Sequence, residues 1–364
     1  MNKRVSIYQV NGALLFGVLV IIILYFGRPF LVPLAFAIVL SMLFMPVSHR
    51  LERWGISRIS ATLLCILLLL VLIAGFCGVI YAQAVTFSND WPQIKPKLQD
   101  VLHRAQEWVH QRFGLTAQEQ ISSLKAQVSK LSSSSGQSIT AAVGALGGLL
   151  TSFVLVVLYM FFLMWKREKF RDFFLKLAAP ENRSDMRDSL DKITEVSAQY
   201  LTGRLISMLF LAAFYAIGLS IVGLENAIMA SIIAVIPTLI PYIGAFIGAT
   251  FPLGMAFLNG SPDMLLPTIA ILVGAQIIDN NIIEPLVMGN ELDLSPIFTI
   301  IAVVAGELIW GIPGMILFEP LFAIIRIVCE HIPALHPYSF LLSNELEEPQ
   351  WVGKMKQMFS KIRS

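Results

Sequence analysis

Residues 236–248 read IPTLIPYIGAFIG and interrupt an apolar run that extends from Ala227 to Leu258. Each proline removes a backbone donor, and each glycine loosens a helix. In lipid, a backbone amide or carbonyl without a partner is costly unless protein or a water-filled cavity satisfies it. A broken backbone at membrane depth therefore indicates a permeation site.

Composition indicates the class of protein. Hydrophobic residues make up 56% of the chain and charged residues 14%, against roughly 25% charged in globular domains. We therefore predict an all-α, polytopic integral membrane helix bundle whose surroundings are the lipid bilayer. The net charge of +2, without a block of Lys and Arg, argues against a nucleic-acid partner. The first apolar segment is too long for a signal-peptide core, so we expect a retained span.

Hydropathy predicts about eight hydrophobic segments of roughly 20 residues or more. These segments are residues 9–26, 30–47, 60–82, 140–165, 205–222, 227–258, 264–278 and 296–328. The segments 227–258 and 296–328 are too long for one untilted helix. Each is either one bent span or a re-entrant hairpin, which gives eight spans or six spans with two hairpins.

Charge sets the expected orientation. Arg50, Arg53 and Arg58 lie between the second and third spans, and the positive-inside rule places them in the cytoplasm, with both chain termini. The predicted divisions are spans 1–3 (1–85), an extracytoplasmic amphipathic helical insertion (86–138), span 4 (139–165), a cytoplasmic amphipathic helical segment (166–204), a C-terminal transport core with broken segments (205–330) and a cytoplasmic tail (331–364).

The outer insertion has an apolar stripe from Trp91 to Trp108 at steps of three and four. Such a stripe must be buried. It either packs on the membrane surface or forms a contact between subunits.

Motifs of enzymes are missing. The sequence has no HExxH, no GxxxxGK[ST], no GxSxG and no Cys/His cluster with metal-ligand spacing. We therefore predict no catalytic residues, no metal and no cofactor. Without a nucleotide-binding loop, uphill transport by this chain alone would need an ion gradient.

Ionisable residues at membrane depth are costly, so they usually face a cavity or a partner. Asp279, Asn280, Asn281 and Glu284 follow one another in AQIIDNNIIEPLVMGN, residues 275–290. A capped helix end at the interface would also explain Asp279 and Asn280. The functional interpretation is a site for a cation or polar substrate, as discontinuous helices provide in secondary transporters.

Two further acids lie in the last apolar stretch. Glu307 and Glu319 either join the site or pair with Arg326. Tyr242 in the broken stretch could offer a hydroxyl and an aromatic face. The residues expected to break or hinge helices are Pro237, Pro241, Gly244, Gly248, Pro252, Pro285, Gly289, Gly311 and Pro313.

Nearly the whole chain resembles the autoinducer-2 exporter family, the PerM-like permeases. The resemblance is strongest in three blocks: YLTGRLI (200–206) leading into PTLIPYIGAFIGATFP (237–252), DNNIIEPLVMGNELDLSP (279–296) and GELIWGIPGMILFEPL (306–321). It implies a transporter of the bacterial inner membrane that forms a homo-oligomer. Arg204, Glu307 and Glu319 depart from the family pattern, which leaves the substrate open.

Together these features predict a secondary transporter that exports a small polar solute or signalling molecule similar to autoinducer-2. Members described as sodium or lithium/proton antiporters make cation exchange the alternative. A membrane scaffold is the alternative outside transport. Asp279 is the expected coupling residue for a proton or monovalent cation, with Asn280, Asn281 and Glu284 completing a polar shell.

Overall fold

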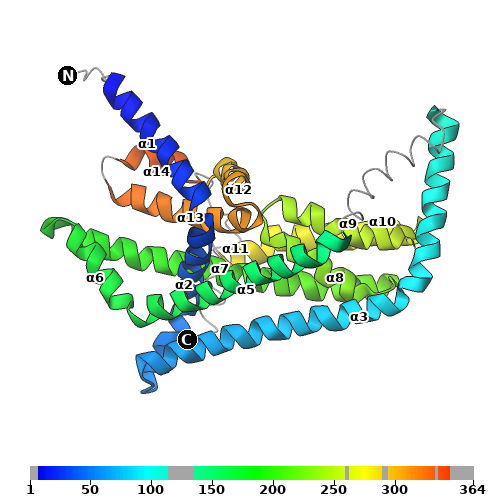
Figure 1. The fold of residues 1–364 in the computed structure, drawn as a ribbon, viewed down its shortest axis with the longest axis horizontal. Helices are drawn as coiled ribbons and strands as arrows, with labels where there is room; N and C mark the ends of the chain where they lie inside the picture. The colour runs from blue at the N-terminus through cyan, green and yellow to red at the C-terminus, as the bar shows by residue number, and fades with distance from the viewer. Residues whose placement is uncertain (1–6, 114–134, 259–261, 289–293, 333–334, 345–364) are drawn as a thin grey trace.

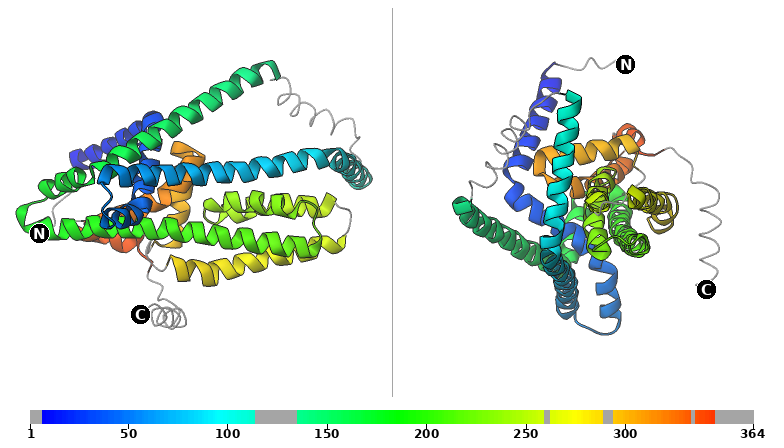
Figure 2. Two further views of the ribbon diagram at one scale, coloured as in Figure 1. Left: turned by 90° about the horizontal axis from the view of Figure 1, so that it is seen from below. Right: turned by 90° about the vertical axis from the view of Figure 1, so that its right-hand side faces the viewer.

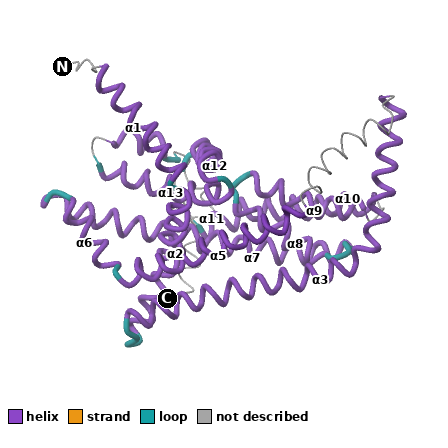
Figure 3. The backbone as a smooth tube through the Cα atoms, viewed as in Figure 1, coloured by secondary structure: helices purple, strands orange, loops and turns teal. Residues whose placement is uncertain are grey.

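The computed structural model describes residues 7–113, 135–258, 262–288, 294–332 and 335–344. Throughout this part of the chain the backbone forms helices and turns without a strand, apart from an isolated bridge between Leu294 and Ser343 (Figure 3). The all-α fold class is confirmed.

The first half of the chain supplies four helices: α1 (Ile7–Phe26), α2 (Arg28–Arg53), α3 (Arg58–Phe113) and α5 (Ser135–Trp165). Helix α2 packs against α3 and α5 around Phe44, Cys65 and Met160. Helix α3 continues into the predicted outer insertion; in Figure 1 it forms the long lower edge and then bends upward at the right-hand side. The second part of that insertion, residues 114–134, lies outside the described residues.

A second long helix, α7 (Arg183–Val222), organises the other half. It follows the short α6 (Arg167–Leu177) after a turn at Pro180–Asn182. At 1.5 Å per residue, its 40 residues extend about 60 Å. The predicted boundary between residues 204 and 205 therefore falls inside a continuous helix.

The apolar stretch 227–258 is a hairpin of two antiparallel helices, α8 (Ala227–Val235) and α9 (Ile243–Leu258). A 3₁₀ turn over Ile236–Leu239 joins them, at the point where prolines remove backbone donors. Gly248 lies so close to the Ala234 carbonyl that a Cβ there would collide with it. Nine residues of α8 extend only about 14 Å, so this helix alone is too short to span a bilayer.

The last apolar stretch is also a helical hairpin, formed by α12 (Pro296–Trp310) and α13 (Ile312–His331). The chain reverses at Gly311, whose φ of 67° favours glycine. Gly306 and Gly314 let the two backbones touch near the turn. The rings of Trp310 and Phe318 pack edge to face, with 5.2 Å between their centroids. The short α14 (His336–Leu342) follows.

Between the two hairpins, α10 (Pro262–Ile278), the π-helical turn η3 (Asp279–Ile283) and α11 (Glu284–Val287) follow one another directly. The amide of Glu284 donates to the Asp279 carbonyl, five residues back, which widens the helix. In Figure 2, α10 lies beside α7 and the α8–α9 hairpin, and these elements bury Leu211, Ala234 and Leu272.

By length and composition, six described helical segments are able to cross a membrane: Arg28–Arg53, Arg58–Gln83, Gly147–Trp165, Pro180–Val222, Asp263–Val287 and Ile312–His331. The two long stretches form helical hairpins, and α1 contributes a shorter apolar helical segment, Leu14–Phe26. The arrangement is a polytopic helical membrane bundle.

Candidate functional site

Helix α7 carries Tyr200, Arg204 and Ser207 at spacings of four and three, which places them on one helical face. Tyr200 and Ser207 are buried, and the Arg204 side chain is only 13% exposed. This polar face points toward η3, α11 and α13, since each of the three side chains finds a partner there.

Asp279 lies at the start of the π-helical turn and is 1% exposed. The hydroxyl of Ser207 lies 2.7 Å from both of its carboxylate oxygens, so it donates to the Asp279 carboxylate. Burying a charged group is costly unless it is paired and hydrogen-bonded. Asp279 is thus a buried carboxylate that has a hydrogen-bond donor on α7.

Arg204 binds Glu284, the first residue of α11. One guanidinium nitrogen lies 2.8 Å from Glu284 Oε1, and the two side chains are largely shielded from solvent. Helix α7 and the end of α11 approach closely here: a Cβ on Gly203 of α7 would collide with the side chain of Met288, which follows α11. Because Gly203 has no side chain, the two segments can come close enough for Arg204 to reach Glu284.

Glu319 of α13 completes the arrangement. The Tyr200 hydroxyl donates to Glu319 Oε2 at 2.7 Å, and both side chains are buried. Arg326, which the sequence offered as a partner for Glu307 or Glu319, lies 3.4 Å from Glu330, one turn further along α13.

We call these six residues the α7 polar cluster: Tyr200, Arg204, Ser207, Asp279, Glu284 and Glu319. Arg204 is also within electrostatic range of Asp279 and Glu319. Three carboxylates therefore share one guanidinium. Among the described residues, no group of three or more His, Cys, Asp or Glu side chains is placed to hold a metal ion. Each carboxylate instead has its own donor on α7.

Tyr242 stands at the tip of the α8–α9 hairpin. It has a φ of 60°, which is unusual for a residue with a side chain, and the residue is 56% exposed. The hairpin turn contacts α7, and Tyr242 lies within electrostatic range of Glu284 and Glu319. The tip of the hairpin therefore holds an exposed phenol within electrostatic range of two carboxylates of the cluster.

Three other predicted site residues lie away from the cluster. Asn280 is exposed and accepts a hydrogen bond from Gln276, and Asn281 is exposed and donates to the Ile277 carbonyl. Glu307 is exposed on α12. The π-helical turn separates Asp279 from its two Asn neighbours, because adjacent residues of a helix point in different directions.

The predicted helix breaks fall into distinct places. Pro237, Pro241, Gly244 and Gly248 form the turn and the close contact of the first hairpin. Pro252 is buried within α9, and Pro285 lies in the first turn of α11. Gly311 and Pro313 make the turn of the second hairpin, and Gly289 lies outside the described residues.

Sequence reasoning missed Tyr200 and Ser207 as site residues and treated Arg204 only as a departure from a pattern. One signal was available. Polar side chains at i, i+4 and i+7 form a stripe on a helix that continues into an apolar span. Their partners lie up to 119 residues away, so the pairing itself required the fold.

A family model described as AI-2E family transporter matches residues 14–334. The chain belongs to the AI-2E family.

Relatives of this AI-2E family protein extend over most of its length. It is 28% identical to the candidate transport protein YueF of Bacillus subtilis (strain 168) over 307 residues, covering 81% of this chain and 82% of that protein. It is 26% identical to the candidate permease PerM of Escherichia coli K12 over 323 residues, covering 85% and 90%. The AI-2E family chain is thus a multi-pass membrane protein of a transporter family, and the membership indicates transport rather than catalysis.

Proposed function

We propose that this protein is a secondary transporter that exports a small polar solute, and that the α7 polar cluster binds the solute or its coupling ion. The observation that carries the proposal is a set of three carboxylates that face one side of α7. Asp279 and Glu284 come from residues 279–284, and Glu319 comes from α13. A purely structural bundle has no need for such groups in its interior, because they are costly at membrane depth.

The charge of the cluster supports coupling to a cation. Arg204 compensates one carboxylate, and two more remain when all three are ionised. Each unbalanced carboxylate gains from binding a proton or a monovalent cation in a site of low polarity. Proton or cation binding at Asp279, the predicted coupling residue, which is 1% exposed, then links the site to an ion gradient.

The donor and acceptor groups also suit a small hydroxylated solute. Carboxylates accept hydrogen bonds from hydroxyls, whereas Arg204 and Tyr242 donate them. Tyr242 adds an aromatic face that is exposed at the hairpin tip. The family resemblance points to a signalling molecule similar to autoinducer-2, which is therefore the solute we propose first.

The hinge residues would shape this site rather than bind. In the first hairpin, Gly244 and Gly248 bring α9 against the backbone of the preceding turn and of α8. Any movement of the hairpin tip would therefore carry Tyr242 with it. The proposed cellular setting is the bacterial inner membrane with both termini in the cytoplasm, and the proposed assembly is a homo-oligomer.

The excess of carboxylates favours a second candidate, exchange of sodium or lithium for protons. Antiport needs only a carboxylate that binds either ion in turn. In that case Asp279, with its single serine donor, is the exchanging group. Export of the organic solute would then be absent.

One experiment separates the two candidates. The purified protein is reconstituted in proteoliposomes, and internal pH is recorded after sodium or lithium is added. Asp279→Asn is compared with Glu307→Gln, a matched control on the exposed side of α12. A cation-driven pH change lost only in Asp279→Asn supports antiport. Solute efflux without such a pH change supports export, and normal activity of Asp279→Asn in both assays rejects Asp279 as the coupling residue.

A further inference from the structure

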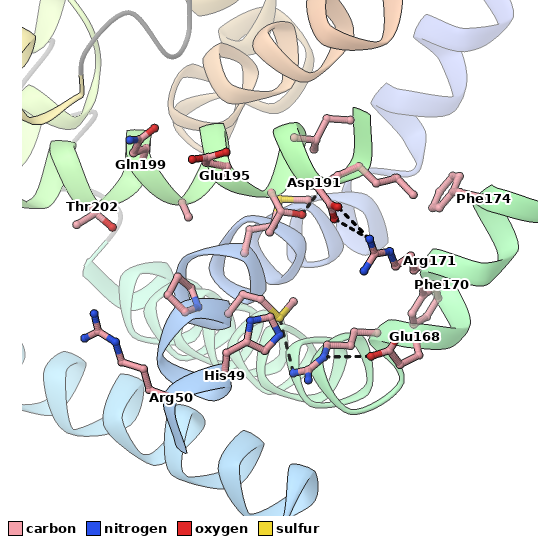
Figure 4. A pocket seen from close by; sticks show the side chains of 18 of the residues that line it. His49, Arg50, Glu168, Phe170, Arg171, Phe174, Asp191, Glu195, Gln199 and Thr202 are labelled. Atoms are coloured by element: carbon pink, nitrogen blue, oxygen red, sulfur yellow. Dashed lines mark hydrogen bonds and ion pairs between the residues drawn. The ribbon is translucent and has the colours of Figure 1, made fainter. Parts of the chain in front are cut away.

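A cavity of about 790 Å³ opens between α2, α6 and α7 (Figure 4), and none of the six residues of the α7 polar cluster lines it. Of its α7 residues, 191, 194, 198 and 202 lie about half a turn from Tyr200, Arg204 and Ser207, whereas Ile193 lies on the face of Tyr200, two turns before it. The volume lies within the usual range for small-molecule sites, roughly 300–1,000 Å³. The cavity is therefore separate from the proposed transport site.

Its lining is divided between apolar and cationic side chains. Met42, Met45 and Ile193 belong to the apolar part. Four arginines also line it, and two of them already have partners: Arg167 binds Glu52 at 2.6 Å, and Arg171 binds Asp191 at 2.9 Å. Figure 4 shows the second of these pairs bridging α6 and α7.

The other two arginines are available. Arg50 and Arg53, three residues apart near the end of α2, are exposed and have no acidic partner within 4.0 Å in the part of the chain that the structure describes. In Figure 4, Arg50 extends from α2 toward Thr202 without a dashed contact. Among the acids that line the cavity, Glu195 also forms no ion pair with a described residue. Arg50, Arg53 and Glu195 together therefore leave an excess of positive charge.

The surroundings place this cavity at a membrane surface. Helix α6 exposes Phe173 and Leu177, while its other residues are mostly charged. Trp54 is exposed at the same end of the bundle, and Trp165 stacks under the Lys166 ammonium at 3.8 Å. Tryptophans and amphipathic helices of this kind lie at the level of lipid headgroups.

We propose that this cavity binds an anionic phospholipid of the adjacent leaflet, with the phosphate at Arg50 and Arg53 and an acyl chain along Met42, Met45 and Ile193. Each guanidinium can donate two parallel hydrogen bonds to phosphate oxygens, and Arg50 and Arg53 are three residues apart on one helix, so both can reach one phosphate. Basic pockets between membrane helices on the cytoplasmic side bind anionic headgroups in this way. A free anion would leave the apolar lining without a partner, whereas a phospholipid uses both parts.

The test uses the full-length protein in mixed micelles and measures lipid retention by native mass spectrometry. Phosphatidylglycerol is compared with phosphatidylcholine for the wild type and for Arg50→Gln/Arg53→Gln. We expect the wild type to prefer phosphatidylglycerol and the double variant to lose about tenfold to thirtyfold in affinity for it. The control Arg183→Gln/Arg187→Gln removes the same charge from exposed positions that do not line the cavity, and should retain the preference.

Three outcomes would overturn the proposal. Equal binding of the two lipids by the wild type excludes an anionic-lipid site. Equal losses in the two double variants assign the preference to overall surface charge. Competition by inorganic phosphate or glycerophosphoglycerol that matches the whole lipid shows a site for a free anion. Unfolding temperatures in phosphatidylcholine micelles confirm that both variants remain folded.

Discussion

Ser207 and Asp279 meet inside the bundle, where the serine hydroxyl lies 2.7 Å from both oxygens of a carboxylate that is 1% exposed. The contact joins α7 to the π-helical turn that follows α10. A wide turn of this kind often marks a functional site, because it reorients side chains within a helix. Here it turns Asp279 inward and leaves Asn280 exposed.

Replacing Ser207 with alanine should lower the free energy of unfolding by about 1–3 kcal/mol, because Asp279 would lose its donor while remaining buried. Unfolding by SDS in mixed micelles measures the change. Ser220→Ala is the control, since Ser220 is exposed and binds only a carbonyl of its own helix. Equal stability of the two variants would show that the Ser207 contact contributes nothing.

The Arg204–Glu284 ion pair should show a coupling free energy of about 1–3 kcal/mol in a double-mutant cycle, because each single variant leaves a shielded charge without its partner. The variants are Arg204→Gln, Glu284→Gln and their combination, measured by the same unfolding. The exposed Arg171–Asp191 pair provides the comparison, with an expected coupling of about 0.2–1 kcal/mol. Additive single effects at Arg204 and Glu284 would contradict the assigned pair.

Gly248→Ala should destabilise the α8–α9 hairpin by about 1–3 kcal/mol, because the new Cβ would meet the Ala234 carbonyl. Gly254→Ala on the same helix is the matched control, since a Cβ at Gly254 would have no atom within 4 Å among the described residues. Alanine there should be neutral or stabilising, as expected for a helix interior. Thermal unfolding of both variants decides whether the contact exists in the membrane protein.

Tyr242→Asn should keep the free energy of unfolding within about 1 kcal/mol, because asparagine tolerates the positive φ and the tyrosine is more than half exposed. Solute efflux from proteoliposomes should fall, since the phenol at the hairpin tip is lost. Phe246→Leu replaces another exposed aromatic of the same hairpin and serves as the control. Unchanged efflux in Tyr242→Asn would remove Tyr242 from the site.

Part of the candidate site was predictable from the sequence. An acid beside a proline-broken apolar segment is costly in lipid, which pointed to Asp279 and Glu284. The same argument pointed equally to Glu307, which is exposed in the structure. The energetic cost of an acid in lipid does not say in which direction its side chain points. The direction depends on the π-helical turn and on which helix lies opposite.

The sequence by itself determined that this chain is a helical membrane bundle with two broken apolar stretches. Lipid allows little other than helices, and prolines and glycines make continuous helices there unfavourable. Only the tertiary structure decided that both stretches fold back as hairpins and that Tyr200, Arg204 and Ser207 meet acids 72 to 119 residues away. These pairings depend on how α7, α10 and α13 pack, and small residues such as Gly203, rather than hydropathy, set how closely the helices approach.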